Sequence, residues 1–420
     1  MKIGIFTYGT RGDLQPYIAL ALGFQARGHA VSIAASADFE PFVRSFGIDF
    51  QALYGHAQQM MQGEEGRRIL KSENALALMK YYFGVLHAIR VPLRQSFMEA
   101  ISKVDCVIAN AMTMPIVSAI TEKQHKKMAL TYFMPPLVPT RAFPVADFDF
   151  CNAGWYNLLT YQLAHAIFWK FTKADTNEFR QELGLKPLKQ NLIRHIDQQK
   201  TLDLYCLSPT LIPQPADWAP QHQITGFLQI PETLVQANPN EQPPEALTQW
   251  LQRGQAPIYM GFGSNAIGNP EKMIRIIQGL LEKTQERIVF CSAWSGMDAL
   301  PKHDRLFTLP FVSHDLLLPH CKLGIFHGGA GTLASMLRHE LPSVIISFYT
   351  DQPTWGKIVA RRHLGVHIPL KKLTLERLIA AIQTADTAKI RREVAITGKL
   401  IRSENGLENS LNAIEAYFAQ

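Results

Sequence analysis

Long apolar segments are missing from this chain of 420 residues. A transmembrane helix needs about 20 mostly apolar residues, and the nearest candidate, residues 155–171, is interrupted by Gln162, His165 and Lys170. The chain opens on Lys2 and a short apolar run, without the basic head, longer apolar stretch and small-residue cleavage site of a signal peptide. We therefore expect a cytoplasmic protein without a membrane span.

Cysteine is scarce and widely spaced. The five cysteines are Cys106, Cys151, Cys206, Cys291 and Cys321. An odd number without a Cys-x-x-Cys pair argues against a zinc cluster or a disulfide framework, so each is expected to fill a small buried apolar position.

Tracts of lysine or arginine are absent as well, which argues against a nucleic-acid partner. The net charge is nevertheless +7, from 42 basic and 35 acidic residues. This mild excess favours an anionic substrate or an acidic membrane surface as the partner.

Short apolar runs alternate with helical patterns in both halves of the chain. Residues 3–7 predict a strand, and a glycine-punctuated loop follows. Pro16 is typical of a first helical turn, the predicted helix runs to about Arg27, and residues 30–35 predict the next strand. This is a βαβ unit of a parallel sheet, whose loops bind ligands at the carboxyl ends of the strands.

The alternation stops between residues 230 and 244, where Pro, Asn, Gln and Glu dominate, as in an interdomain linker. It restarts afterwards, so we expect an α/β protein with two doubly wound, Rossmann-like domains facing across a cleft. The expected domains are residues 1–235 and residues 236–400, with a C-terminal helix over 401–420 that packs back on the first domain.

The strongest motif is Ile325-Phe326-His327-Gly328-Gly329-Ala330-Gly331-Thr332. A predicted strand enters a glycine-rich turn and a helix begins at once. Glycine lets the backbone approach a ligand closely, and the N–H groups and dipole at a helix N-terminus bind phosphate. His327 and Thr332 offer further donors, although such a turn also occurs with no ligand.

Two further loops follow predicted strands. Asp351-Gln352 comes after the strand over 344–347 and opens on the same sheet edge. A carboxylate beside a carboxamide suits the vicinal hydroxyls of a sugar, while helix capping is the commoner use of such an Asp. Gly261-Phe262-Gly263-Ser264 offers backbone and hydroxyl donors to a diphosphate, and is equally typical of a structural turn.

Asp13 stands in the N-terminal loop Gly9-Thr10-Arg11-Gly12-Asp13. A carboxylate there could accept the proton of an acceptor hydroxyl. It could equally cap the following helix, and the pattern leaves both roles open.

Taken together, these motifs resemble the family-one glycosyltransferases of the GT-B fold over nearly the whole chain. The likeness is greatest to the bacterial antibiotic and macrolide glycosyltransferases and to the sterol glucosyltransferases. It is carried by two stretches: Gly9-Thr10-Arg11-Gly12-Asp13-Leu14-Gln15-Pro16, and Pro310-Phe311-Val312-Ser313-His314-Asp315 through the His327 motif to Asp351-Gln352.

The resemblance implies a role for each matching residue. Asp13 falls at the position of the catalytic base. The implied donor contacts are Phe311 stacked on the nucleotide base, Val312 at the base edge, Ser264, His327, Gly329, Ala330, Gly331 and Thr332 on the diphosphate, and Asp351 and Gln352 on the sugar. Ser335 and His314 depart from the plant signature, so the nucleotide stays open, with a UDP-sugar favoured and a dTDP-sugar second.

The resemblance thus implies an inverting, UDP-sugar-dependent hexosyltransferase acting on a hydroxyl of a small lipophilic acceptor. No metal or other cofactor is expected, because the Asp-x-Asp pattern at Asp147 lies far from the phosphate loop. A sugar-nucleotide epimerase of the same fold and a non-catalytic nucleotide-sugar-binding helper are the alternatives.

Aromatic residues crowd the segment 143–171. Aromatic faces bury flat apolar ligands well, so we expect an acceptor wall there. The expected acceptor contacts are Phe143, Phe148 and Trp155, joined by Tyr82 and Arg11. Core packing, or an amphipathic helix in peripheral contact with a membrane, would explain the same composition.

Overall fold

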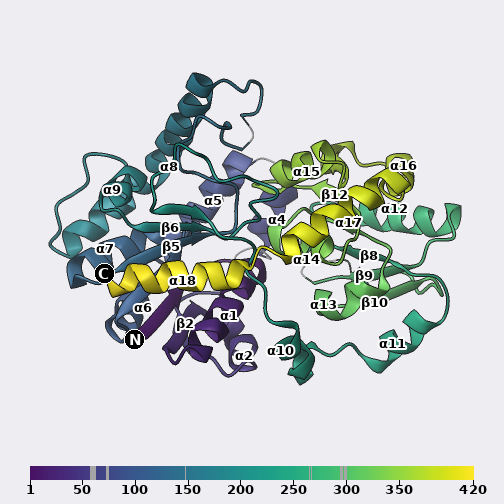
Figure 1. The fold of residues 1–420 in the computed structure, drawn as a ribbon, viewed down its shortest axis with the longest axis horizontal. Helices are drawn as coiled ribbons and strands as arrows, with labels where there is room; N and C mark the ends of the chain where they lie inside the picture. The colour runs from purple at the N-terminus through teal and green to yellow at the C-terminus, as the bar shows by residue number, and fades with distance from the viewer. Residues whose placement is uncertain are drawn as a thin grey trace. The chain divides into compact units, whose positions relative to one another are not determined.

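The computed structural model describes residues 1–56, 63–71, 75–146, 148–263, 265, 267–293, 297 and 300–420. The chain divides into two compact units (Figure 1). Unit 1 comprises Met1–Met60, Met79–Ile230 and Glu404–Gln420, and unit 2 comprises Met61–Leu78 and Pro231–Ser403. The chain thus passes from unit 1 to unit 2 after Ile230 and returns to unit 1 at Glu404.

Unit 1 is built on a seven-stranded parallel sheet with the order β3-β2-β1-β4-β5-β6-β7. Its strands are β1 (Lys2–Phe6), β2 (Ala30–Ser36), β3 (Asp49–Leu53), β4 (Cys106–Asn110), β5 (Met128–Tyr132), β6 (Leu202–Tyr205) and β7 (His222–Ile224). Its helices are α1 (Arg11–Ala26), α2 (Glu40–Arg44), α6 (Arg90–Ser102), α7 (Met114–Gln124), α8 (Gly154–Glu182), α9 (Leu192–Gln198) and α18 (Gly406–Ala419). Helix α5 (Ala75–Ala88) crosses the boundary between the units.

Unit 2 repeats this winding on a six-stranded parallel sheet with the order β10-β9-β8-β11-β12-β13. Its strands are β8 (Ile258–Gly261), β9 (Ile288–Cys291), β10 (Leu306–Leu309), β11 (Leu323–Phe326), β12 (Ser343–Ser347) and β13 (Gly365–Pro369). Its helices are α4 (Glu64–Lys71), α10 (Glu232–Ala237), α11 (Glu245–Gln252), α12 (Pro270–Lys283), α13 (His314–Leu317), α14 (Ala330–Arg338), α15 (Gln352–Arg361), α16 (Leu375–Ala385) and α17 (Ala388–Arg402).

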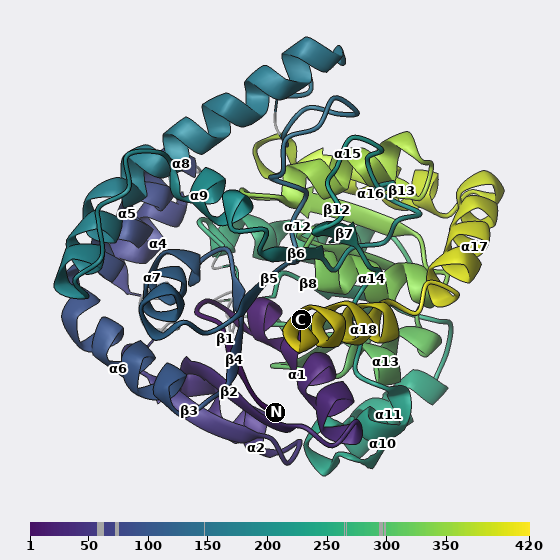
Figure 2. The same ribbon diagram turned by 60° about the vertical axis from the view of Figure 1, so that its left-hand side comes forward.

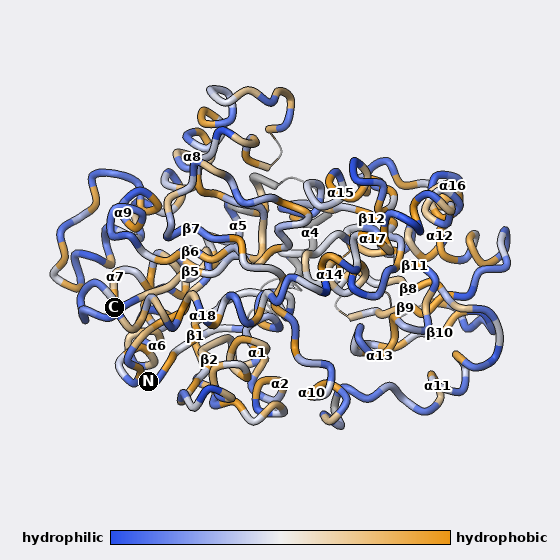
Figure 3. The backbone as a smooth tube through the Cα atoms, viewed as in Figure 1, coloured by the Kyte–Doolittle hydropathy of each residue, from blue (hydrophilic) through white to orange (hydrophobic). Residues whose placement is uncertain are grey.

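Both sheets reverse their strand order once, between β1 and β4 in unit 1 and between β8 and β11 in unit 2. Ligands of doubly wound sheets bind outside the carboxyl ends of the strands at this point. The central strands are buried throughout and therefore read as continuous apolar runs, which Figure 3 shows along the strands of both units. The predicted fold class, two Rossmann-like parallel-sheet domains, is confirmed.

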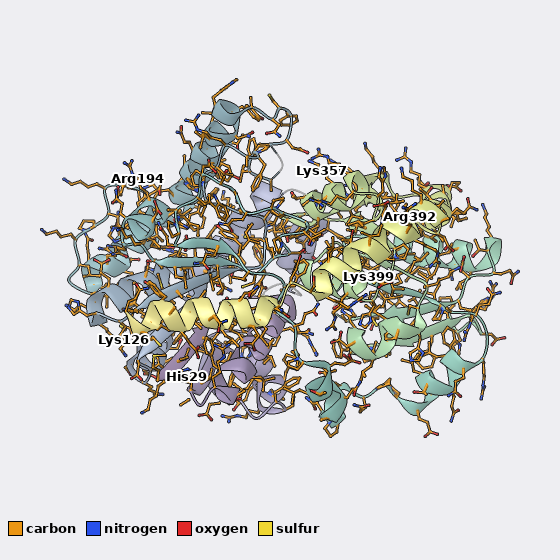
Figure 4. All side chains as sticks on the ribbon, in the orientation of Figure 1. His29, Lys126, Arg194, Lys357, Arg392 and Lys399 are labelled. Carbon is orange, nitrogen blue, oxygen red and sulfur yellow. The ribbon has the colours of Figure 1, made fainter. Side chains whose placement is uncertain are left out.

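Helix α18 packs along α1 in unit 1, as Figure 1 and Figure 2 both show. Arg27 forms ion pairs of 2.6 Å with Glu408 and with Glu415, and the ring of His29, labelled in Figure 4, lies 2.9 Å from Glu415. The C-terminal helix is therefore part of the first unit, although the chain reaches it only after completing the second.

The predicted linker over 230–244 contains the boundary between the units, at Ile230, and also α10 and the short 3₁₀ helix Pro239–Glu241. Two local expectations were wrong. Helix α1 begins at Arg11, so Pro16 lies inside the helix and not in its first turn, since the capping loop adds a turn before it. Four cysteines are buried as expected, but Cys151 is exposed.

No helix in the described part of the chain is long and apolar enough to cross a bilayer.

Candidate functional site

One group of candidate site residues lies at the carboxyl end of β1 in unit 1. Asn110, the last residue of β4, donates through its side-chain amide to the Thr7 hydroxyl at 2.9 Å. The Thr113 hydroxyl donates to the Phe6 carbonyl oxygen at 3.1 Å. These buried hydrogen bonds join the ends of two adjacent strands at the reversal point and fix the start of the loop that carries Asp13.

Asp13 occupies the first turn of α1 and closes a capping box with Thr10. Its Oδ2 atom accepts a hydrogen bond from the Thr10 backbone N–H at 2.8 Å and another from the Thr10 hydroxyl at 3.1 Å. Both hydrogen bonds from Thr10 go to Oδ2, and neither involves Oδ1. The two roles that the sequence left open are thus compatible, because capping uses one carboxylate oxygen and leaves the second for a substrate.

The surroundings of Asp13 change its acidity. Burial raises the pKa of the Asp13 carboxyl above its ordinary value, and the two hydrogen bonds from Thr10 only partly oppose this. A carboxylate with a raised pKa is a stronger base, and active sites use burial in this way to tune a general base.

Tyr82 lies within the electrostatic reach of Asp13. Its hydroxyl is buried, and the part of the chain that the structure describes offers it no hydrogen-bond partner. Burial raises the pKa of Tyr82, and the charge of Asp13 raises it further. A buried hydroxyl without a partner is costly unless a ligand satisfies it, so Tyr82 is well placed to bond an acceptor.

Of the other expected acceptor residues, Arg11 begins the same helical turn as Asp13, and the aromatic residues lie elsewhere in unit 1. Arg11 stacks its guanidinium on the Phe42 ring, 4.0 Å from the centroid. Phe143 and Phe148 are half-buried, and the Phe148 carbonyl accepts a hydrogen bond from Tyr156. Trp155 is 70 % exposed on α8. The aromatic segment is therefore divided between a loop and a helix surface, and is not one continuous buried wall.

Gly9 sets the position of the Asp13 carboxylate. A Cβ atom on Gly9 would lie 2.4 Å from Asp13 Oδ2, whereas a Cβ on Gly12 would meet nothing closer than the Thr10 hydroxyl at 3.6 Å. We predict that Gly9→Ala displaces the carboxylate and lowers kcat about 10²-fold, the order of loss that a misplacement of about 1 Å causes.

The matched control is Gly12→Ala, which adds the same methyl group inside the helix and should leave kcat near the wild-type value. Steady-state kinetics of the two variants measure the difference. Equal effects of the two substitutions would show that the position of the Asp13 carboxylate does not limit turnover.

A second group of candidate site residues lies at the carboxyl end of β11 in unit 2. The His327 ring sits between two glycines: a Cβ on Gly329 would lie 2.4 Å from its Nε2, and a Cβ on Gly263 would lie 3.1 Å from its Cε1. Its buried Nδ1 has no hydrogen-bond partner among the described residues. Burial, together with the charge of His314, lowers the pKa of His327 to about 4, so at neutral pH the ring is uncharged and one nitrogen is a hydrogen-bond donor.

Helix α14 begins directly after this ring, with Gly329 as its N-cap. The N–H groups of the first turn of a helix have no partner inside the helix. Gly331 is exposed, and a Cβ added to it would have no atom within 4 Å. Thr332 is half-buried in the same turn, and Ala330 is buried beneath it. This open helix N-terminus beside an imidazole donor is suited to a phosphate group.

Asp351 and Gln352 differ in availability. Asp351 Oδ2 accepts a hydrogen bond from the Trp355 indole at 2.9 Å, its Oδ1 accepts one from the Thr350 hydroxyl at 3.0 Å, and the side chain remains half-buried. Gln352 is only 5 % exposed. Its amide oxygen accepts from the Phe348 N–H at 2.9 Å, and its amide nitrogen donates to Asn265 Oδ1 at 3.2 Å. Gln352 therefore joins the loops after β8 and β12, and Asp351 is the more accessible of the pair.

We predict that Gln352→Leu destabilises unit 2 by about 2 kcal/mol, because the Phe348 N–H and the Asn265 amide lose a buried partner. Urea denaturation followed by circular dichroism measures the change. The control is Gln249→Leu on α11, where the side chain is exposed and bonds only Glu245, and we expect a change within about 0.5 kcal/mol. Equal stability of the two variants would refute the proposal that Gln352 joins the loops after β8 and β12.

The remaining donor residues are placed as follows. Phe311 is half-buried in the loop after β10, and Val312 beside it is buried. Ser264 and Asp147 lie outside the described residues. In the described ranges, no cluster of three or more His, Cys, Asp or Glu side chains is arranged to hold a metal ion.

Sequence reasoning missed Asn110, Thr113, Asn265 and Tyr8. All of them follow or end a strand, and a polar residue at that position was the available signal. Tyr8 donates to the Tyr54 carbonyl oxygen at 3.3 Å. Burial and the charge of Asp38 raise its pKa to about 12.

Two parts of the chain match known domain families. Residues 3–143 match the glycosyltransferase family 28 N-terminal domain. Residues 278–404 match the C-terminal domain of the proteins described as erythromycin biosynthesis protein CIII-like. The first match contains the Asp13 loop, and the second contains the His327 turn and Asp351-Gln352.

The chain is also similar in sequence to sterol 3-beta-glucosyltransferases. It is 32 % identical to one from Arabidopsis thaliana, with 100 % of this chain and 65 % of the relative covered. It is 31 % identical to one from Saccharomyces cerevisiae, with 98 % of this chain and 35 % of the relative covered. The chain thus spans less than two thirds of the length of these relatives.

Solved antibiotic glycosyltransferases share the fold. The glycotransferase of kitacinnamycin superimposes with a TM-score of 0.70 at 16 % identity, covering 99 % of this chain and 98 % of that one. Glycosyltransferase VinC, solved in complex with dTDP, gives 0.67 at 15 % identity with full coverage of both chains. At these identities the likeness shows the architecture alone.

Proposed function

Since the chain belongs to the family-one glycosyltransferases of the GT-B fold, we propose that it transfers a hexose from a nucleotide diphosphate sugar to a hydroxyl of a small lipophilic acceptor. The observation that carries the proposal is that each unit of the chain holds one of the two groups that the reaction needs. Unit 1 offers a half-buried carboxylate with an oxygen outside its capping bonds, and unit 2 offers an open helix N-terminus beside a neutral histidine.

In the proposed reaction, the Asp13 carboxylate removes the proton of the acceptor hydroxyl as the oxygen attacks the anomeric carbon. The bond from that carbon to the diphosphate breaks in the same displacement, so the configuration inverts and the nucleotide diphosphate leaves with the bonding electrons. Tyr82 donates a hydrogen bond to the acceptor, which satisfies its buried hydroxyl.

The donor is held through its diphosphate at the N-terminus of α14. As the leaving group gains negative charge, the N–H groups of the first turn, the His327 ring and the Thr332 hydroxyl stabilise it more than they stabilise the intact donor, which is the condition for catalysis. Ser264 and the backbone of Gly329, Ala330 and Gly331 complete the phosphate contacts, and no metal ion is needed to hold the diphosphate.

The base and the sugar are recognised by other loops of unit 2. Phe311 stacks on the nucleotide base, and the backbone of Val312 bonds its edge. Asp351 accepts the sugar hydroxyls, while Gln352 chiefly holds the loop in place. The proposed donor is a UDP-hexose, with glucose favoured because the sterol relatives are named as glucosyltransferases.

We predict an acid limb in the pH profile of kcat/KM that lies above the ordinary aspartate pKa of about 3.9. The base works only when ionised, and the raised pKa of Asp13 means that this form is lost at a higher pH as the solution is acidified. His327, with a pKa of about 4, should add no inflection near neutrality. Initial rates measured across acidic to neutral pH test both points. A fall of kcat/KM near neutral pH that disappears in His327→Ala would contradict them.

Donor screening tests the proposed function directly. Thermal-shift measurements with UDP-, dTDP- and GDP-sugars identify the donor, and incubation with sterols and other lipophilic alcohols follows. The expected result is a glycoside and free nucleotide diphosphate in equal amounts. If the donor is converted to its epimer without any acceptor, the protein is an isomerase and not a transferase. If it binds the donor but turns over no acceptor, it has a binding role only.

A further inference from the structure

The N-terminal half of α8 carries an exposed apolar stripe. Trp155, Leu159 and Leu163 are spaced four residues apart and therefore lie on one helix face. They are 70 %, 52 % and 46 % exposed, and Phe150 just before the helix is 86 % exposed. Large apolar side chains gathered in this way on a surface mark an interaction site.

This stripe belongs to a part of α8 that stands away from the sheet of unit 1, as Figure 1 and Figure 2 both show. The C-terminal half of the helix is different, because its acidic residues are bonded to α6. Arg90 and Arg94 pair with Glu178, and Arg94 also pairs with Glu182 at 2.9 Å. The N-terminal half is also held to unit 1, since Asn157, Thr160 and His165 are hydrogen-bonded to the loop 137–145, and it exposes the stripe on its other face.

The charge of the exposed face is of one sign. Asp149 directly precedes Phe150, but no Asp or Glu occurs between Phe150 and Ala174. Lys170 and Lys173 are exposed on the same helix face as the apolar stripe, and within the described residues neither forms an ion pair. The chain as a whole is basic, with a net charge of +7. An apolar stripe that ends in lysines matches a lipid bilayer, whose interior is apolar and whose anionic headgroups are negative.

We propose that this face of α8 docks on the surface of a bilayer that contains anionic lipid, with Phe150, Leu159 and Leu163 inserted among the acyl chains and Lys170 and Lys173 at the headgroups. The Trp155 indole would lie at the boundary between the acyl chains and the headgroups, where indole is favoured because it is apolar with one polar N–H. A second copy of this chain would bring the same positive charge to the contact, so charge opposes self-association through this face. The inference goes beyond the proposed function and does not depend on it.

The test is co-sedimentation of the whole protein with vesicles of phosphatidylcholine and phosphatidylglycerol, without donor or acceptor. Leu159→Glu with Leu163→Glu should lower the partition coefficient about tenfold or more, since two apolar anchors become charged. Lys170→Gln with Lys173→Gln should lower it about fivefold per lysine, as the loss of a charge near an anionic surface predicts.

Helix α17 supplies a matched control pair. Ile396 and Leu400 are 46 % and 50 % exposed with the same four-residue spacing, and Arg392 and Lys399, labelled in Figure 4, lie on the same helix. Ile396→Glu with Leu400→Glu therefore makes the same change in charge and apolarity at another basic helix, and should leave binding near the wild-type level.

A blue shift of tryptophan emission on addition of vesicles, absent in Trp155→Phe, is the second readout. Four results would overturn the proposal: no sedimentation of the wild type, equal loss with the α8 and α17 pairs, binding as strong to pure phosphatidylcholine, or a blue shift that persists in Trp155→Phe. All four are independent of turnover, so their outcome leaves the transferase proposal to its own test.

Discussion

Asp13→Asn is expected to lower kcat by about 10²–10⁴-fold, the contribution of a positioned general base. The amide cannot take the proton of the acceptor hydroxyl at neutral pH. It has the same shape as the carboxylate, and its oxygen can still accept the Thr10 N–H that now bonds Oδ2 at 2.8 Å. The capping of α1 is therefore kept, and the affinity for the donor, which binds on unit 2, should not change.

Asp38→Asn is the matched control for this substitution. Asp38 is a half-buried carboxylate of the same unit, bonded to the His56 ring at 2.9 Å and to the Ser36 hydroxyl at 3.1 Å. The same acid-to-amide change there should leave kcat close to that of the wild type. Wild-type turnover in Asp13→Asn would remove the base from the mechanism, and an equal loss in both variants would point to general destabilisation.

The second large effect is expected from His327→Ala, which should lower kcat by about 10²–10³-fold, as the loss of one donor to a developing anion does. The ring lies between Gly263 and Gly329, beside the open first turn of α14. Because its pKa is about 4, it acts through a hydrogen bond and not through a positive charge. The loss should therefore be nearly the same across neutral pH.

His367→Ala is the control in the same unit. The His367 ring is also half-buried, but it bonds the Ser347 hydroxyl at 2.8 Å and packs against Gly356. Its removal is expected to affect stability more than turnover. If both histidine variants lost the same turnover with the same change in melting temperature, the effect of His327→Ala would be structural.

Much of the fold could be predicted because buried parallel strands leave a strong pattern. Ile288–Cys291 and Leu323–Phe326 are continuous apolar runs, and the helix Pro270–Lys283 opens on a proline, so their bounds agree with prediction. The predicted start of α1 was wrong. Pro16 suggested a first helical turn, but the capping box of Thr10 and Asp13 begins the helix at Arg11.

The roles of site residues were harder to predict, since they depend on contacts across loops. Asp351 and Gln352 are adjacent in sequence. Only the structure shows that the side-chain amide of Gln352 is already hydrogen-bonded to Asn265 and to the Phe348 backbone N–H. Aromatic content alone also did not separate Tyr82, whose buried hydroxyl lies near Asp13, from Trp155, whose side chain is exposed on α8. Composition identifies apolar side chains, but it does not say which surface they face.

The central claim is that phosphate binding at the turn after β11 and proton removal by Asp13 are separate tasks of one enzyme. Calorimetric titration of the donor sugar nucleotide into Asp13→Asn and His327→Ala tests it most directly. The account predicts wild-type affinity in the inactive Asp13→Asn variant and clearly weakened binding in His327→Ala. Weakened binding in Asp13→Asn together with unchanged binding in His327→Ala would contradict it.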